Sequence, residues 1–263
     1  MTDIILEFAE LIFQIAVLAF VFVRSVTLIR RNGNSVVPVF FCFGILAFLI
    51  SDFYWMAHSL MLPEVRIPFA VNLMGENSIS LLFSALLIAV YGKGKIKPGI
   101  EMMFTALFAV ASTTIWIAYS GEWLKDILSG IVYGYFLCVT IGALKVSQAL
   151  TKREWASTAL VSFSVIGMQV LMLFTKPQIA SVFDTLSIAI LFMAFIYFTA
   201  KTLYILKNGK DSGKLVSLAF FCFAWITSTM YMSTGRWYII ASIACSLDLI
   251  LLLVSVRRKV EAQ

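Results

Sequence analysis

Long apolar runs follow one another along the whole chain, and short polar segments separate them. Nine runs can be placed, over residues 4–29, 36–61, 68–91, 100–119, 124–147, 156–175, 178–206, 215–233 and 237–256. An α-helix needs about 20 apolar residues to cross a bilayer, and most of the runs reach that length. The pattern therefore predicts an all-α, polytopic membrane protein, with about nine transmembrane helices in a single transmembrane domain over residues 1–263.

The basic residues lie mainly in the polar segments, and they favour alternate segments. Sixteen of the twenty Lys and Arg residues fall on one side of the predicted membrane and four on the other. These four are Arg66, Lys125, Lys176 and Arg236. Cytoplasmic loops are enriched in Lys and Arg, so we expect the N-terminus outside and the C-terminus inside. This orientation needs an odd number of spans; nine fits, and seven is the alternative count.

Composition narrows the class of protein further. Hydrophobic residues make up 61% of the chain and charged residues only 13%, whereas a soluble domain is about 25% charged. This excludes a soluble globular protein, and the high apolar content excludes a disordered one. The net charge of +6 belongs to the loops, so we expect the lipid bilayer as partner, no nucleic acid, and a location in the plasma (inner) membrane.

The four cysteines all lie inside apolar runs, and no two have CxxC spacing. We therefore expect neither a disulfide framework nor a zinc site, and we assign no metal ligands. The sequence has one histidine and neither a GxSxG nor a GxxxxGK[ST] motif. This argues against a serine hydrolase with a nucleophile elbow and against a nucleotide-binding loop. The cofactor, if any, is left open.

Two stretches of the chain are similar to each other. Ala19–Gly33 reads AFVFVRSVTLIRRNG and Ala194–Gly209 reads AFIYFTAKTLYILKNG, and an FFCF segment follows each, at Phe40–Phe43 and Phe220–Phe223. The elements recur in order at an offset of 175 to 180 residues. This predicts an internal repeat, with four helical hairpins and a ninth helix. Chance similarity in a strongly hydrophobic sequence is the alternative.

Five acidic residues fall inside the apolar runs. They are Glu10, Asp52, Glu76, Asp184 and Asp248. An ionised carboxylate inside a bilayer is costly unless it is paired or hydrated, so each is a candidate functional residue. Four of the five lie at a similar depth from the outer ends of their spans, and Asp248 lies nearer the midplane. The acids therefore predict a site that opens to the outer side of the membrane.

The third span carries a polar stripe. Asn72, Glu76, Ser80 and Ser84 are spaced at i, i+4, i+8 and i+12, which places them on one face of a helix. Such a face must contact protein or water rather than lipid. Helix–helix packing explains the two serines, but it does not explain a glutamate. Glu76 is therefore a candidate functional residue.

The second span ends in SDFYWMAHSL (Ser51–Leu60), which combines an acid, aromatic residues and the only histidine. Trp55 shares a helical face with Asp52 at i, i+3, although an interfacial aromatic belt also explains it. His58 is six residues beyond Asp52 and points elsewhere, so an Asp–His pair on this helix has poor geometry. Asp52 is the principal candidate in this segment.

The same segment resembles the lysoplasmalogenase-like membrane protein family. Proteins of that family carry Gly-Asp or Ser-Asp at the end of an apolar helix, and ILAFLISDFYW (Ile45–Trp55) is similar to that element. The likeness covers Phe40 to about Leu82. The chain departs from the family at MGENS (Met74–Ser78), where the family has a His-containing segment, and it has no second Asp motif. The resemblance implies hydrolysis of the vinyl ether of lysoplasmalogens, and it carries over to Asp52 only.

Two carboxyl groups in a low-dielectric pocket can serve as acid and base. We therefore predict a membrane-embedded hydrolase of a lipid or other amphiphile, with Asp52 and Glu76 as its catalytic residues. The candidate substrate-binding residues are Asn72, Ser80, Ser84, Asp184, Glu10, His58 and Trp55. One alternative is a small-solute or ion-coupled transporter, which the nine-span layout and Asp248 favour. Another is a ligand-sensing membrane domain, which would need a partner to supply its output.

Overall fold

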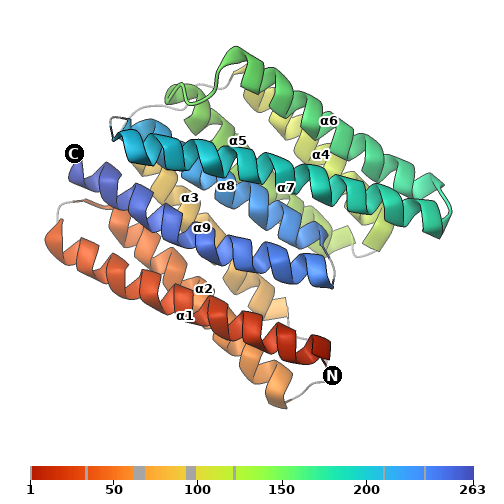
Figure 1. Cartoon of the computed structure of the whole chain (residues 1–263), viewed down its shortest axis with the longest axis horizontal. Helices are drawn as coiled ribbons and strands as arrows, with labels where there is room; N and C mark the ends of the chain where they lie inside the picture. The colour runs from red at the N-terminus through yellow and green to blue at the C-terminus, as the bar shows by residue number, and fades with distance from the viewer. Residues whose placement is uncertain are drawn as a thin grey trace.

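The computed structural model describes residues 2–32, 35–61, 69–92, 99–120, 123–209, 211–233 and 235–263. These residues form nine α-helices and no strand (Figure 1). The helices are α1 (Thr2–Arg31), α2 (Val37–Met61), α3 (Phe69–Tyr91), α4 (Ile100–Ser120), α5 (Trp123–Val146), α6 (Lys152–Phe174), α7 (Pro177–Asn208), α8 (Ser212–Met232) and α9 (Arg236–Glu261). The all-α prediction is confirmed for this part of the chain.

Each helix coincides with one of the predicted apolar runs. The largest differences are at α6, which begins at Lys152 rather than at residue 156, and at α9, which continues to Glu261 rather than to residue 256. In the described residues, seven helices are long and apolar enough to cross a membrane. The described apolar parts of α3 and α4, Asn77–Tyr91 and Ile100–Ile115, are shorter. The chain is therefore a multi-pass helical bundle of the membrane type.

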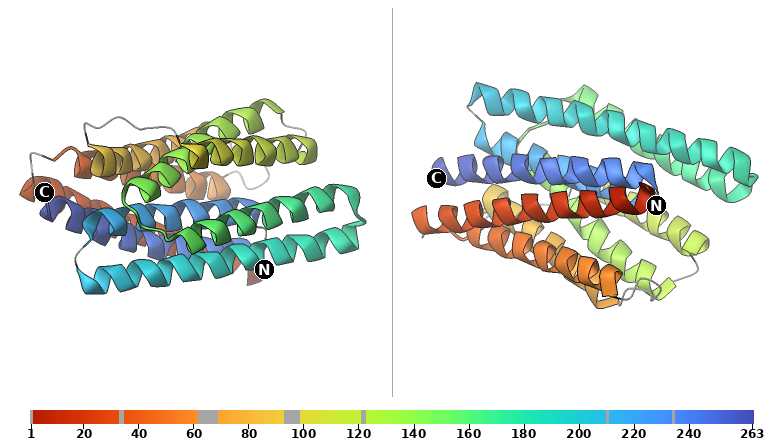
Figure 2. Two further views of the ribbon diagram at one scale, coloured as in Figure 1. Left: turned by 90° about the horizontal axis from the view of Figure 1, so that it is seen from above. Right: turned by 60° about the horizontal axis from the view of Figure 1, so that its bottom comes forward.

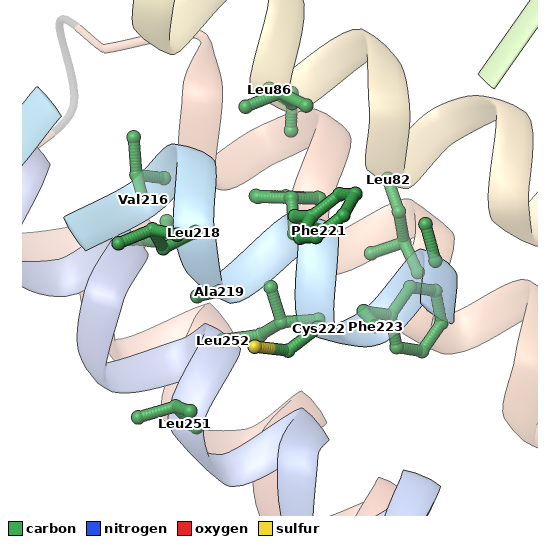
Figure 3. Packing of buried hydrophobic residues seen from close by; sticks show 14 of the residues in the cluster. Leu82, Leu86, Val216, Leu218, Ala219, Phe221, Cys222, Phe223, Leu251 and Leu252 are labelled. Atoms are coloured by element: carbon green, nitrogen blue, oxygen red, sulfur yellow. The ribbon is translucent and has the colours of Figure 1, made fainter. Parts of the chain in front are cut away.

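Helix α8 lies at the centre of the bundle. It packs against α9, α7, α5 and α3 (Figures 1 and 2). Residues 215–224 of α8 are buried without interruption, so this stretch has no side that faces lipid. Figure 3 shows part of the core, in which Phe223 of α8 lies beside Leu82 of α3, and Cys222 of α8 lies beside Leu252 of α9.

One end of the bundle gathers basic side chains and their partners. Lys145, at the end of α5, forms an ion pair of 2.5 Å with Glu101 at the start of α4. Lys201, near the end of α7, forms another of 2.5 Å with Glu154 at the start of α6. Arg258, near the end of α9, donates to a backbone carbonyl of α7. This is the end that the charge pattern assigns to the cytoplasm, and the two termini lie at opposite ends of the bundle (Figure 1).

Among the described residues, helices α2 and α3 pack against each other more extensively than any other two helices of the bundle. Gly44 permits their close approach, because a Cβ at this position would lie 2.8 Å from Leu82 Cγ and 3.2 Å from the Leu82 backbone N. Ser78 Oγ donates a hydrogen bond of 2.7 Å to the backbone carbonyl of Gly44. These contacts fix the level of α3 relative to α2, and so they determine which part of α3 lies beside Asp52.

Candidate functional site

Buried polar side chains meet where α1 and α9 pack together. Glu10 of α1 is 8% exposed and accepts a hydrogen bond from Oγ of Ser242, a fully buried residue of α9. The same hydroxyl lies 3.3 Å from Oε1 of Gln14, one turn further along α1. Nε2 of Gln14 is buried and has no hydrogen-bond partner among the described residues. The first and last helices of the bundle thus share an enclosed polar contact.

Asp52 lies on α2, which packs against both α1 and α9. Its side chain is buried, and its Oδ2 has no hydrogen-bond partner in the described part of the chain. Asp52 and Glu10 are close enough for their charges to interact, and Tyr238 of α9 lies near both acids. The structure therefore brings two of the predicted acids together on neighbouring helices. Because like charges repel, a proton or a cation bound to this pair stabilises it.

The polar stripe on α3 is only partly described. The helix includes Asn72 and Glu76, but the side chains of these two residues lie outside the described part of the structure. A Cβ at Gly75 would lie 3.9 Å from Oγ of Ser51. The stretch of α3 that carries Glu76 is therefore level with the stretch of α2 that carries Asp52.

Two of the remaining candidates, Ser84 and His58, have contacts within their own helices. Ser84 Oγ donates to the backbone carbonyl of Ser80 at 2.8 Å. His58 is buried and stacks on Tyr54, one turn earlier in α2, with 6.4 Å between the ring centroids. Trp55 is half-buried. His58 and Trp55 lie near the C-terminal end of α2, about one to two turns beyond Asp52.

Asp184 lies apart from this group. It is half-buried on α7, which packs principally against α6 and α8. Figures 1 and 2 show α8 and α9 between α7 on one side and α1 and α2 on the other. The structure thus places Asp184 outside the group that Glu10 and Asp52 form.

Sequence reasoning singles out neither Gln14 nor Ser242, although both belong to the buried polar group. The helical period contains a signal for Gln14, which is four residues from Glu10 and so shares its helical face. Ser242 is six residues from Asp248 and does not share the face of that acid. A search for neutral polar residues on the faces of the buried acids would therefore have found Gln14 but not Ser242.

The two acids of this group, Glu10 and Asp52, have different surroundings. These surroundings determine which reactions each acid can take part in. Glu10 is oriented by a hydroxyl donor, whereas Asp52 keeps a free oxygen. Such a pair can donate and accept protons or bind a hydroxyl group. In the described part of the chain, no three His, Cys, Asp or Glu side chains are placed to share a metal ion.

The comparisons with known proteins give no relative. No family model matches the chain, no curated protein is significantly similar to it, and no solved structure matches its fold. The resemblance of Ile45–Trp55 to the lysoplasmalogenase-like family therefore stays a prediction.

Proposed function

We propose that the chain crosses the membrane nine times with its N-terminus outside, and that its outward-facing acidic site hydrolyses a lipid or another amphiphile. The observation that carries this proposal is Asp52, a buried acid with a free carboxylate oxygen, on the stretch of α2 that is level with the stretch of α3 carrying Glu76. A second buried acid, Glu10, is held by Ser242 beside it. Two acids at one level of neighbouring helices can serve as a proton donor and a proton acceptor.

This arrangement supports cleavage of an acid-labile bond such as a vinyl ether. In the proposed reaction, the carboxylic acid of Asp52 donates a proton to carbon, and the resulting cation takes up water while Glu76 removes a proton from that water. The hemiacetal then breaks down to an aldehyde and an alcohol, so one water is consumed and the proton returns to the site. Glu10 and Gln14 are the proposed contacts to the polar head group.

The position of the acids supports an amphiphilic substrate. On α1, Phe13 is exposed and lies three residues from the buried Glu10, so a lipid chain that packs on Phe13 would lie within one helical turn of the acid. Trp237, at the outer end of α9, has the aromatic character that favours the interface between membrane and water. A substrate with one apolar chain and one polar head therefore fits this position better than a fully polar solute.

The test uses purified protein in lipid nanodiscs and a 1-alkenyl lysophospholipid. We expect the wild-type protein to release an aldehyde, and we expect Asp52→Asn to lower the rate by about 100-fold or more, the usual contribution of a general acid. Glu76→Gln should lower the rate in the same way. The 1-alkyl lysophospholipid, which lacks the double bond, should not be cleaved.

Glu7→Gln is the matched control for Glu10→Gln, because Glu7 is on the same helix but exposed. We expect the rate to fall in Glu10→Gln and to stay unchanged in Glu7→Gln. A wild-type protein that releases no aldehyde would contradict the vinyl ether as substrate. Full activity in Asp52→Asn would contradict the assignment of Asp52 as the acid.

An ion-coupled carrier is the second candidate function. The observation that favours it is Asp248, a buried acid on α9 that lies nearer the middle of its helix than Glu10 and Asp52 lie to the middles of theirs. Acids at two depths are typical of proton pathways in pumps and transporters. Proton-driven uptake of a solute into proteoliposomes, lost in Asp248→Asn and accompanied by no aldehyde release, would favour the carrier over the hydrolase.

A further inference from the structure

Asp248 lies in the middle of α9 and has no compensating contact. Its side chain is 3% exposed, and neither carboxylate oxygen has a hydrogen-bond partner among the described residues. An ionised carboxylate in such surroundings would lose its hydration without gaining a partner, which is among the costliest arrangements in a protein. A neutral carboxylic acid avoids most of that cost.

The groups that face Asp248 provide no positive charge. Cys245 on its own helix and Cys222 on α8 are close enough to interact with it electrostatically. Towards α1 and α2, the next titratable groups are Glu10 and Asp52, which interact with Cys245. No described Lys, Arg or His forms an ion pair with Asp248. The described titratable groups around Asp248 are thus two thiols and two other acids. None of them compensates a negative charge on Asp248, so they favour the protonated carboxylic acid.

Polar side chains lie on α9 between Asp248 and the outer end of the bundle. Ser242, Cys245 and Asp248 are spaced at i, i+3 and i+6 on the buried face of α9, and Ser242 donates to Glu10. In the other direction, the buried face continues with Leu249 and Leu252. On α9, the first hydroxyl on that side is that of Ser255, which donates to the backbone carbonyl of Leu251 at 2.7 Å. The hydroxyl of Thr202 on α7 lies 3.6 Å from Sγ of Cys222, and it donates to the backbone carbonyl of Phe198 at 2.7 Å.

We propose that Asp248 is a proton-binding site within the membrane, and that its proton exchanges with the outer surface through Cys245, Ser242 and Glu10. Each exchange moves one proton in and one proton out, so the bundle gains no charge. The proposal concerns a site other than the Asp52–Glu76 pair, and it holds for a hydrolase and for a carrier alike.

The first test is infrared spectroscopy of the protein in lipid at neutral pH. We expect a C=O stretching band of a protonated carboxylic acid that shifts in D₂O and is lost in Asp248→Asn. Asp248→Glu serves as a second variant, because it keeps an acid and should keep such a band at a shifted frequency. A spectrum in which neither variant changes a protonated-acid band would overturn the site.

The second test measures how fast that band exchanges with deuterium. We expect Ser242→Ala and Glu10→Gln to slow the exchange by about tenfold or more, which corresponds to a barrier higher by roughly 1.4 kcal/mol. Ser255→Ala is the matched control, since Ser255 is also fully buried on α9 but lies on the inner side of Asp248. Slower exchange in Ser255→Ala together with an unchanged rate in Ser242→Ala would overturn the outward path.

Discussion

At the scale of single residues, the hydroxyl of Ser242 serves two side chains of another helix. It donates to Glu10 and lies 3.3 Å from Oε1 of Gln14. Ser242→Ala leaves these buried oxygens without a donor, so we expect the free energy of unfolding to fall by about 1–3 kcal/mol. Denaturant unfolding in detergent micelles, followed by circular dichroism, measures this change.

Ser255→Ala is the control for this comparison. Ser255 is equally buried on α9, but its Oγ bonds to the backbone carbonyl of Leu251 on its own helix, its one hydrogen bond among the described residues. Removing it leaves no side chain of another helix without a partner, so we expect a loss below about 1 kcal/mol. Equal losses in the two variants would show that the contact between Ser242 and α1 adds nothing to stability.

Individual acids were predictable from the sequence, but their grouping was not. Glu10 and Asp52 stand out because a charge inside an apolar run is rare. Asp184 stands out in the same way and at a similar depth, yet it lies on α7, away from the other two. Depth along a helix can be counted from the sequence, whereas lateral position depends on how helices pack. Ser242 escaped notice because a single serine in a membrane helix ordinarily serves packing.

At the scale of the helices, the α2–α3 pair depends on one glycine. A Cβ at Gly44 would lie 2.8 Å from Cγ and 3.2 Å from the backbone N of Leu82, so the helices would have to move apart. We expect Gly44→Ala to destabilise the protein by about 1–3 kcal/mol, as overpacking does in other cores. Gly167→Ala on α6, where a new Cβ would meet no atom within 4 Å, should be close to neutral or stabilising. Thermal unfolding in detergent compares the two.

The start of α6 is tied to α7 through Glu154. Its Oε1 accepts from Lys201 Nζ at 2.5 Å and from Tyr197 OH at 2.7 Å, and its Oε2 accepts from the backbone N of Thr151 at 2.7 Å. Glu154→Ala removes a helix cap and an interhelical contact together, so we expect a loss of about 1–3 kcal/mol.

Glu261→Ala removes a carboxylate with a single partner and is the matched control for Glu154→Ala. The pair of Glu261 with Arg257 joins two largely exposed side chains within α9, and such pairs contribute less than about 1 kcal/mol. Chemical denaturation should therefore separate the two variants clearly. Similar midpoints would mean that the Glu154 contacts do not hold α6 against α7.

Apolar runs predicted the number of helices and most of their ends. They missed the polar first turn of α6 and the last turn of α9, because a helix that leaves the bilayer can continue through charged residues such as Lys152 and Arg258. The runs do not indicate which helices become neighbours. The internal repeat that would pair α1–α2 with α7–α8 stays a prediction.

At the scale of the whole molecule, the orientation in the membrane is the main prediction. Gln148, between α5 and α6, and Gln178, at the start of α7, are both exposed and lie at opposite ends of α6. We expect a membrane-impermeant thiol reagent to label Gln178→Cys in intact cells and Gln148→Cys only after permeabilisation. Three native cysteines are buried and Cys138 is half-buried, so Cys138→Ser provides a suitable background. Labelling of both from the same side would contradict the nine-span orientation.

The bond between Glu10 and Ser242 also has a consequence for biosynthesis, because 232 positions separate its two ends. At a synthesis rate of about 5–20 residues per second, roughly 10–50 s pass between the synthesis of Glu10 and the synthesis of Ser242. During that time Glu10 belongs to an incomplete chain, in which water, lipid head groups or the insertion machinery must stabilise its carboxyl group. A chain that ends before α9 lacks the partner of Glu10, so this contact forms only after the helix that carries Ser242 has been made.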